Sequence, residues 1–110
     1  MDGKLIELTD ENFEEEVVNS TIPVMVDFYA DWCAPCKAMT PTLESLSKEM
    51  EGDLKIGKVN VEKSTLSSRY SISSLPAVLM FKGGEVIDRK IGSQNKKSLV
   101  ALASGGIKNG

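Results

Sequence analysis

The chain has 110 residues, of which 41% are hydrophobic and 26% charged, and its formal net charge is −3. This composition is ordinary for one soluble globular domain spanning residues 1–110, and the charge favours binding neither to nucleic acid nor to an anionic membrane surface. No apolar run approaches the ~20 residues that a bilayer span requires, and residues 1–4 lack the apolar stretch of a signal peptide, so we expect a cytoplasmic protein.

The first third of the chain alternates strands and helical segments. Residues 5–8 form a short apolar strand, and a helix follows that Thr9 or Asp10 can cap. Residues 24–29 are apolar except for one acid. Such a nearly continuous apolar run is typical of a strand that is covered on both faces.

A long helix is predicted after residue 33. Its apolar residues recur at spacings of four, three and four, the pattern of one helical face: Met39, Leu43, Leu46 and Met50. Gly52 marks its end. Residues 54–61 alternate partly and predict a strand, and residues 64–70 predict a short helix begun by Ser64.

The last third of the chain contains a predicted hairpin and a predicted helix. A continuous apolar strand, residues 77–81, and a second strand, residues 85–91 with apolar Val86 and Ile91, flank Gly83-Gly84, which suits a two-residue turn with positive φ. A final helix carries Leu99, Val100 and Leu102, and we expect Gly105-Gly106 to end it. The order βαβαβαββα predicts an α/β fold with helices on both faces of one sheet.

The segment Trp32-Cys33-Ala34-Pro35-Cys36-Lys37 contains both cysteines of the chain. It lies where a strand gives way to a helix, and a helix N-terminus favours thiolate over thiol. The thiolate is the species that attacks a disulfide. Because the second cysteine lies one helical turn away, the pair predicts dithiol/disulfide exchange.

Other uses of the cysteine pair are weaker. A zinc or iron–sulfur site needs about four ligands, usually Cys or His, and the chain has 2 Cys and 0 His. A c-type haem motif requires His where Lys37 stands. A structural disulfide closing so short a loop contributes roughly 2 kcal/mol in the loop-entropy picture. We therefore expect no metal and no cofactor other than the redox-active disulfide.

Asp27 interrupts the apolar strand of residues 24–29, so we expect its carboxyl group to be buried. Burial disfavours the charged form and raises the pKa, which suits a general base near neutral pH. The proton to be moved is that of the Cys36 thiol. The alternative is an acid that faces outward.

The sequence resembles the thioredoxin family over essentially its whole length. The resemblance rests on these stretches: residues 26–37, Lys58-Val59-Asn60-Val61, Leu75-Pro76, Phe81-Lys82-Gly83-Gly84-Glu85 and Ile91-Gly92. It implies a thioredoxin fold, with a central five-stranded mixed sheet flanked by four helices. It also implies a cis peptide bond before Pro76, next to the cysteine pair.

The resemblance also implies roles for individual residues. Cys33, which we expect to be the more exposed cysteine, attacks the substrate, and Cys36 resolves the mixed disulfide. Lys58 pairs with Asp27 from the neighbouring strand, although a lysine that points to solvent is the competing interpretation. The expected substrate-binding residues surround the pair: Trp32, Ala34, Pro35, Leu75, Pro76 and Gly92. Ala34 replaces the family's usual Gly, and Tyr29 replaces a frequent Trp.

The predicted function is that of a monomeric protein-disulfide reductase. Oxidising and isomerising relatives usually place His between the cysteines, and this chain has no histidine, which favours a reductant. The expected partners are thioredoxin reductase, as electron donor, and target proteins with disulfides. A thiol oxidase or isomerase and a binding module without redox turnover remain as alternatives.

Overall fold

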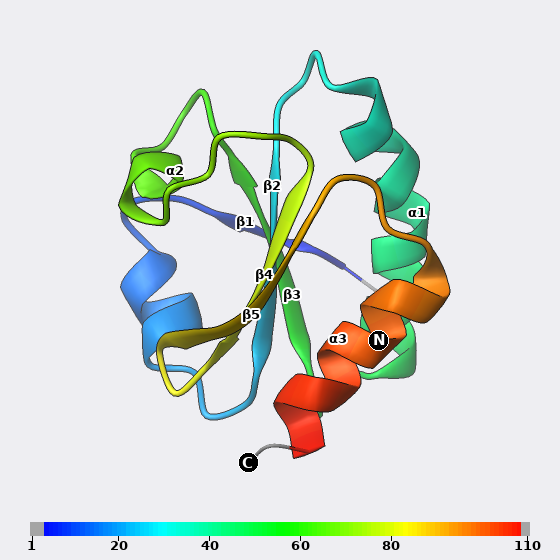
Figure 1. Ribbon diagram of the computed structural model, residues 1–110. Coiled ribbons are helices and arrows are strands. Elements are labelled where there is room, and N and C mark those ends of the chain that lie inside the picture. The colour runs from blue at the N-terminus through cyan, green and yellow to red at the C-terminus, as the bar shows by residue number, and fades with distance from the viewer. Residues whose placement is uncertain (1–3, 109–110) are drawn as a thin grey trace.

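The computed structural model describes residues 4–108, so the expectation about a signal peptide falls mostly outside it. Nine elements follow one another in the order that the sequence predicts (Figure 1): β1 (Ile6–Leu8), η1 (Glu14–Val18), β2 (Val24–Tyr29), α1 (Ala34–Glu49), β3 (Lys55–Asn60), α2 (Leu66–Arg69), β4 (Ala77–Lys82), β5 (Glu85–Ile91) and α3 (Lys96–Lys108). Within residues 4–108, no helix has the length and apolarity needed to cross a bilayer.

The five strands form one mixed sheet in the order β1-β3-β2-β4-β5. β1 and β2 both pair with β3 in parallel, whereas β4 pairs antiparallel with β2 and with β5. β2 is therefore the central strand and has neighbours on both sides. The predicted five-stranded mixed sheet with four helical segments is confirmed.

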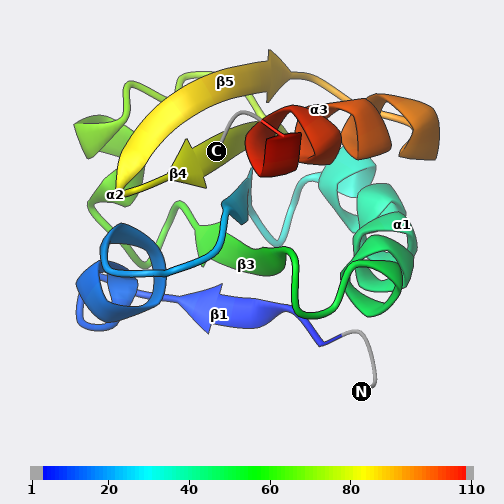
Figure 2. The same ribbon diagram turned by 90° about the horizontal axis from the view of Figure 1, so that it is seen from below.

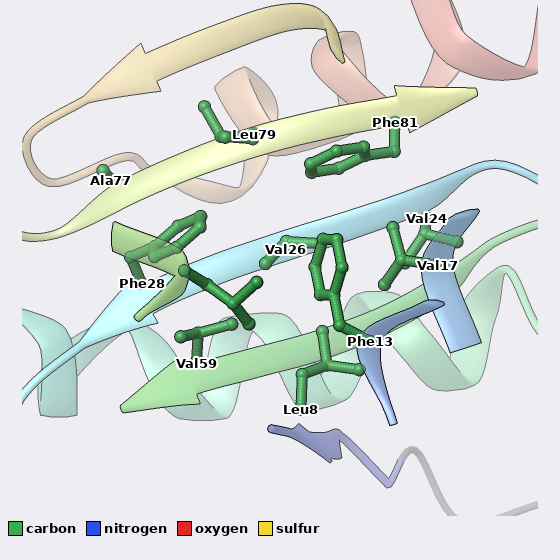
Figure 3. Close-up of a cluster of buried hydrophobic side chains, with 11 residues drawn as sticks. Leu8, Phe13, Val17, Val24, Val26, Phe28, Val59, Ala77, Leu79 and Phe81 are labelled. Carbon is green, nitrogen blue, oxygen red and sulfur yellow. The ribbon is translucent and has the colours of Figure 1, made fainter. Parts of the chain in front are cut away.

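Helices cover both faces of the sheet, and each face has its own apolar core (Figure 2). Side chains from η1, α2 and one face of the strands form the first core, which Figure 3 shows in close-up. In it the rings of Phe13, Tyr70 and Phe81 contact one another in tilted or edge-to-face arrangements, with ring centroids 5.2–5.7 Å apart. The second core lies between the other face and the helices α1 and α3. This two-sided cover explains why β2 and β4 are almost wholly apolar.

The segment after β1 differs from the expected helix. Its regular part, η1, is a π-helix, in which the Asn19 amide donates to the Glu14 carbonyl. Thr9 does act at the start of the segment, where its hydroxyl accepts from the Asn12 amide at 3.2 Å. Asp10 instead accepts from the Ser64 hydroxyl (2.7 Å) and the Thr65 amide (3.0 Å), so it holds the start of α2.

The expectation that Gly105-Gly106 ends the last helix is wrong, because α3 continues to Lys108. Gly106 is buried, and a Cβ built on it would lie 2.6 Å from the Met80 Cε. Its carbonyl accepts from the Lys82 ammonium at 3.1 Å. The missing side chain at Gly106 therefore lets α3 pack closely on β4 rather than stopping the helix.

The two glycines of α3 make a matched pair for a stability test. Gly105→Ala should stabilise the fold by about 0.5–1 kcal/mol, since Ala is the better helix former and nothing lies within 4 Å of the new Cβ. Gly106→Ala brings the same propensity gain but forces the buried Met80 side chain to move, so it should be the less stable variant. Urea unfolding of both variants measures the difference. Equal stabilities would contradict this account of Gly106.

Candidate active site

Cys33 is the N-cap of α1, and its sulfur atom acts as the capping acceptor. Its backbone is extended, with φ −93° and ψ 101°, and the Cys36 amide donates to Cys33 Sγ at 3.3 Å. Pro35 lies in the first turn, where its missing N–H leaves no helical bond unmade. The sulfur of Cys33 thus occupies the position where the amide groups and dipole of a helix N-terminus stabilise negative charge.

Cys33 and Cys36 are joined in a disulfide, with their Cα atoms 5.3 Å apart. Both are buried, and Cys33 is the more exposed, at 5% against 2%. Ala30, Tyr29, Val61 and Leu75 pack around the pair. The order of exposure agrees with the expectation from the sequence, although the difference is small.

The expected cis bond joins Leu75 to Pro76. Pro76 is buried, and its carbonyl accepts from the Gly92 amide at 2.8 Å. Gly92 has a φ of +93°, in the region that favours glycine. The loops before β4 and after β5 lie at the same end of the sheet as the start of α1 (Figure 1).

The segments expected to bind substrate therefore meet around the disulfide. Within them Ala34 and Pro35 are exposed, and Leu75 is half-buried against the cysteines.

Trp32 is the most exposed large apolar side chain of the described residues, at 68%. Its indole Nε1 donates to Glu62 Oε2 at 2.9 Å. This bond fixes the edge of the ring while its faces stay open beside Cys33. Glu62 was not expected as a site residue, because it follows β3 in a turn where no sequence periodicity points to the cysteines.

Trp32 should report the redox state of the disulfide, because it is the sole tryptophan and adjoins Cys33. We expect the disulfide to quench its emission and the fluorescence to rise on reduction. The matched control is the double variant Cys33→Ser/Cys36→Ser, whose emission dithiothreitol should leave unchanged. Identical spectra for the oxidised and reduced parent would argue against the close placement of ring and disulfide.

Asp27 is buried, as the sequence predicts, with only 1% of its surface exposed. Its Oδ1 has no hydrogen-bond partner in the described chain. Desolvation raises the pKa of Asp27 to about 7, against a smaller opposite effect of the Lys58 charge. A carboxyl group with this pKa can exchange a proton near neutral pH.

Lys58 is opposite Asp27 in the register of β3 and β2, but no ion pair joins them among residues 4–108. Its ammonium instead lies over the Tyr29 ring, 4.4 Å from the centroid. The direct pairing inferred from the resemblance is therefore not found, and Lys58 acts on Asp27 through its charge. The position over the Tyr29 ring is favourable because the aromatic face attracts the ammonium group without requiring its full desolvation, whereas an ion pair with buried Asp27 would require it.

A cavity of about 210 Å³ lies between Cys36 and the side chains of Tyr29 and Lys58. It is lined by Tyr29, Ala30, Asp31, Cys36, Lys37, Thr40 and Lys58. The cavity therefore gives water access to Cys36 from the side on which Lys58 lies, whereas Asp27 does not line it.

Tyr29 contacts both Lys58 and Glu7, which the sequence did not indicate. Its hydroxyl donates to the Glu7 carboxylate, at 3.0 Å to Oε2 and 3.2 Å to Oε1. Burial, followed by the hydrogen bond to Glu7, raises the pKa of Tyr29 to about 12, so the phenol stays protonated as a donor. The sequence gives no sign of a role for Glu7, because it is an exposed residue of a short strand. Only the pairing of β1 with β3 shows that Glu7 lies on the same face of the sheet as Lys58.

The described residues include no group of three or more His, Cys, Asp or Glu placed to hold a metal ion.

Comparison with known proteins gives one consistent result. The family model described as Thioredoxin matches residues 4–104. A thioredoxin of Rickettsia bellii is 44% identical over 101 residues, which cover 91% of this chain and 96% of that protein. Thioredoxin C-2 of Corynebacterium nephridii is 45% identical over 103 residues, covering 93% and 95%. A thioredoxin of Buchnera aphidicola is 44% identical over 107 residues, covering 96% and 99%.

Proposed function

Because the chain belongs to the thioredoxin family and carries a Cys33–Cys36 disulfide, we propose that it reduces protein disulfides with Cys33 as nucleophile and Cys36 as resolving thiol. The observation that carries this assignment is the Cys33 sulfur at the N-terminus of α1, where it accepts from the Cys36 amide. A thiolate formed at Cys33 keeps that donor and the helix dipole. Cys36, inside the first turn, lacks this position.

The reaction begins with the reduced protein. The Cys33 thiolate attacks one sulfur of a substrate disulfide, the substrate S–S bond breaks, and the other substrate sulfur leaves as a thiolate and is protonated. A mixed disulfide now joins Cys33 to the substrate. The Asp27 carboxylate takes the proton of the Cys36 thiol. The cavity beside Cys36 is also lined by Lys58, the residue opposite Asp27 in the sheet, and it gives this step access to water.

The Cys36 thiolate then attacks the Cys33 sulfur. The mixed disulfide breaks, the second substrate thiol is released, and the Cys33–Cys36 disulfide forms. Two electrons have passed to the substrate. They are restored by a reductase, for which the family membership supports thioredoxin reductase.

The substrate segment docks on the surface around the disulfide. Exposed Trp32 provides an apolar face, and Ala34, Pro35, Leu75, Pro76 and Gly92 surround the sulfur atoms. Backbone groups in the loop 74–76 and apolar contacts with Trp32 suit an extended peptide carrying one half of a disulfide.

The wider setting belongs to the same proposal. The chain acts as a single-domain monomer in the cytoplasm, where it keeps protein thiols reduced and passes electrons to target enzymes. The absence of histidine from the whole sequence supports the reducing direction.

Reduction of insulin disulfides by dithiothreitol tests the function. We expect the protein to accelerate insulin precipitation, and the double variant Cys33→Ser/Cys36→Ser to have no effect. Equilibration with glutathione buffers separates a reductase from an oxidase or isomerase, because the reductase should be mostly oxidised where an oxidase is mostly reduced. A double variant that retained full biological function would favour the binding-module alternative.

A further inference from the structure

Three charged residues form a row across neighbouring strands. Lys58 on β3 is opposite Glu7 on β1 and opposite Asp27 on β2. Side chains at matched positions of adjacent parallel strands point to the same face of the sheet. Lys58 therefore has a carboxyl group on each side, one exposed and one buried.

Tyr29 extends the row on the same face, two residues after Asp27. Its hydroxyl donates to Glu7, and its ring lies under the Lys58 ammonium. A phenol that donates to a carboxylate has a more electron-rich ring, and such a ring attracts a cation more strongly. Glu7 is thus placed to act on Lys58 in two ways: directly by its charge, and through Tyr29.

We propose that Glu7 is a positioning residue that, together with Tyr29, holds the Lys58 ammonium over the ring and away from Asp27. The Asp27 carboxyl group then stays largely uncompensated, and it can still be protonated near neutral pH. The inference deepens the proposed function, because it concerns the group assigned as base for Cys36.

Three other charged groups lie near this face. Asp31 in the loop after β2 and Lys37 on α1 line the cavity beside Cys36 together with Lys58. Lys63, after β3, lines a second cavity together with Glu7, Tyr29 and Asp31, and it too is unchanged in the variants below. From β4, the residue opposite Asp27 is the apolar Val78. Asp31, Lys37 and Val78 are unchanged in the variants below, so they give the same background in each.

The primary test is Glu7→Gln, read by the carboxyl ¹³C titration of Asp27 in the oxidised protein. A lysine released from the ring spends more time near Asp27, so the midpoint should fall by roughly half a pH unit or more. Glu44→Gln, which removes an exposed charge from α1, is the matched control and should leave the midpoint unchanged. An unchanged midpoint in Glu7→Gln would overturn the proposal.

The same substitution in a Lys58→Gln background distinguishes positioning from a direct charge effect. If Glu7 acts through Lys58, its substitution should shift the Asp27 midpoint much less when Lys58 is absent. Equal shifts in both backgrounds would overturn the proposal. The ε-methylene protons of Lys58 give a second signature, because the ring-current offset from Tyr29 should shrink in Glu7→Gln.

The titration and the ring-current measurement do not depend on reductase activity, and the pH profile of disulfide exchange is a separate readout. If the midpoint falls and that profile moves with it, both the positioning role and the base assignment are supported. A fall in the midpoint with an unmoved exchange profile would support the positioning role and contradict Asp27 as the base.

Discussion

Cys33→Ser is expected to abolish reaction with disulfide substrates, whereas Cys36→Ser should attack once and then remain attached to its substrate. Only Cys33 has its sulfur at the N-terminus of α1, where the Cys36 amide donates to it. A serine at that position cannot form the bond to substrate sulfur. A serine at position 36 leaves attack intact but removes the internal thiol that releases the substrate.

Mass spectrometry after incubation with cell extract measures this asymmetry. Cys36→Ser should capture covalent partners that dithiothreitol releases, and Cys33→Ser should capture none. Partners captured by Cys33→Ser, or equally by both variants, would reverse or remove the assigned roles. The captured proteins would also identify the physiological substrates.

Asp27→Asn is expected to make the oxidised protein more stable near neutral pH, and by an amount that depends on pH. Burial raises the pKa of Asp27 from 3.8 to about 7 in the folded protein. Below the unfolded value the carboxyl is protonated in both states and has no effect on unfolding through its charge. As the pH rises, the unfolded chain loses this proton first, so the parent becomes less stable until the folded carboxyl also ionises.

The gap in unfolding free energy between Asp27→Asn and the parent should therefore widen between about pH 4 and pH 7. Its slope is at most about 1.4 kcal/mol per pH unit, so a pKa difference of about three units gives an accumulated difference on the order of 4 kcal/mol. Above pH 7 the gap should level off. Disulfide exchange should be slower in the variant, because the amide cannot take the Cys36 proton.

Urea unfolding at a series of pH values gives the curve, with Asp53→Asn as the control for loss of an exposed carboxylate. The control should track the parent across the range. A flat difference for Asp27→Asn, together with unchanged exchange kinetics, would mean that Asp27 is neither a costly buried acid nor the base.

Most of the architecture followed from patterns that burial on two faces imposes. The continuous apolar runs at 24–29 and 77–81 became the two most buried strands, and the Gly83-Gly84 turn has the expected positive φ at both residues. The sequence predicts the last helix too short, because glycine commonly ends exposed helices whereas Gly106 is buried. What decides there is the room beside Met80, and only tertiary packing reveals it.

The active site shows the same division. The cysteine spacing and the acid within an apolar strand were sufficient to predict Cys33, Cys36 and buried Asp27. The position of Lys58 could not be predicted in this way. Its ammonium group lies among two carboxyl groups and a ring, and its place depends on the balance of their attractions and of desolvation. That balance depends on Glu7 and Tyr29, which are distant from Lys58 in the sequence and are brought next to it only by strand pairing.

The central place of β2 has a consequence for the chain before it has folded. During synthesis β2 emerges ahead of both its partners, and its pairing with β4 must wait until residues 77–82 are made. An unpaired apolar strand is a template for aggregation, and one charge within it is the usual safeguard. In the unfolded chain Asp27 has its ordinary pKa of 3.8 and is ionised. The carboxyl group that destabilises the folded protein thus gives the nascent strand a negative charge, and we expect variants that gain stability by losing it to refold with lower soluble yield.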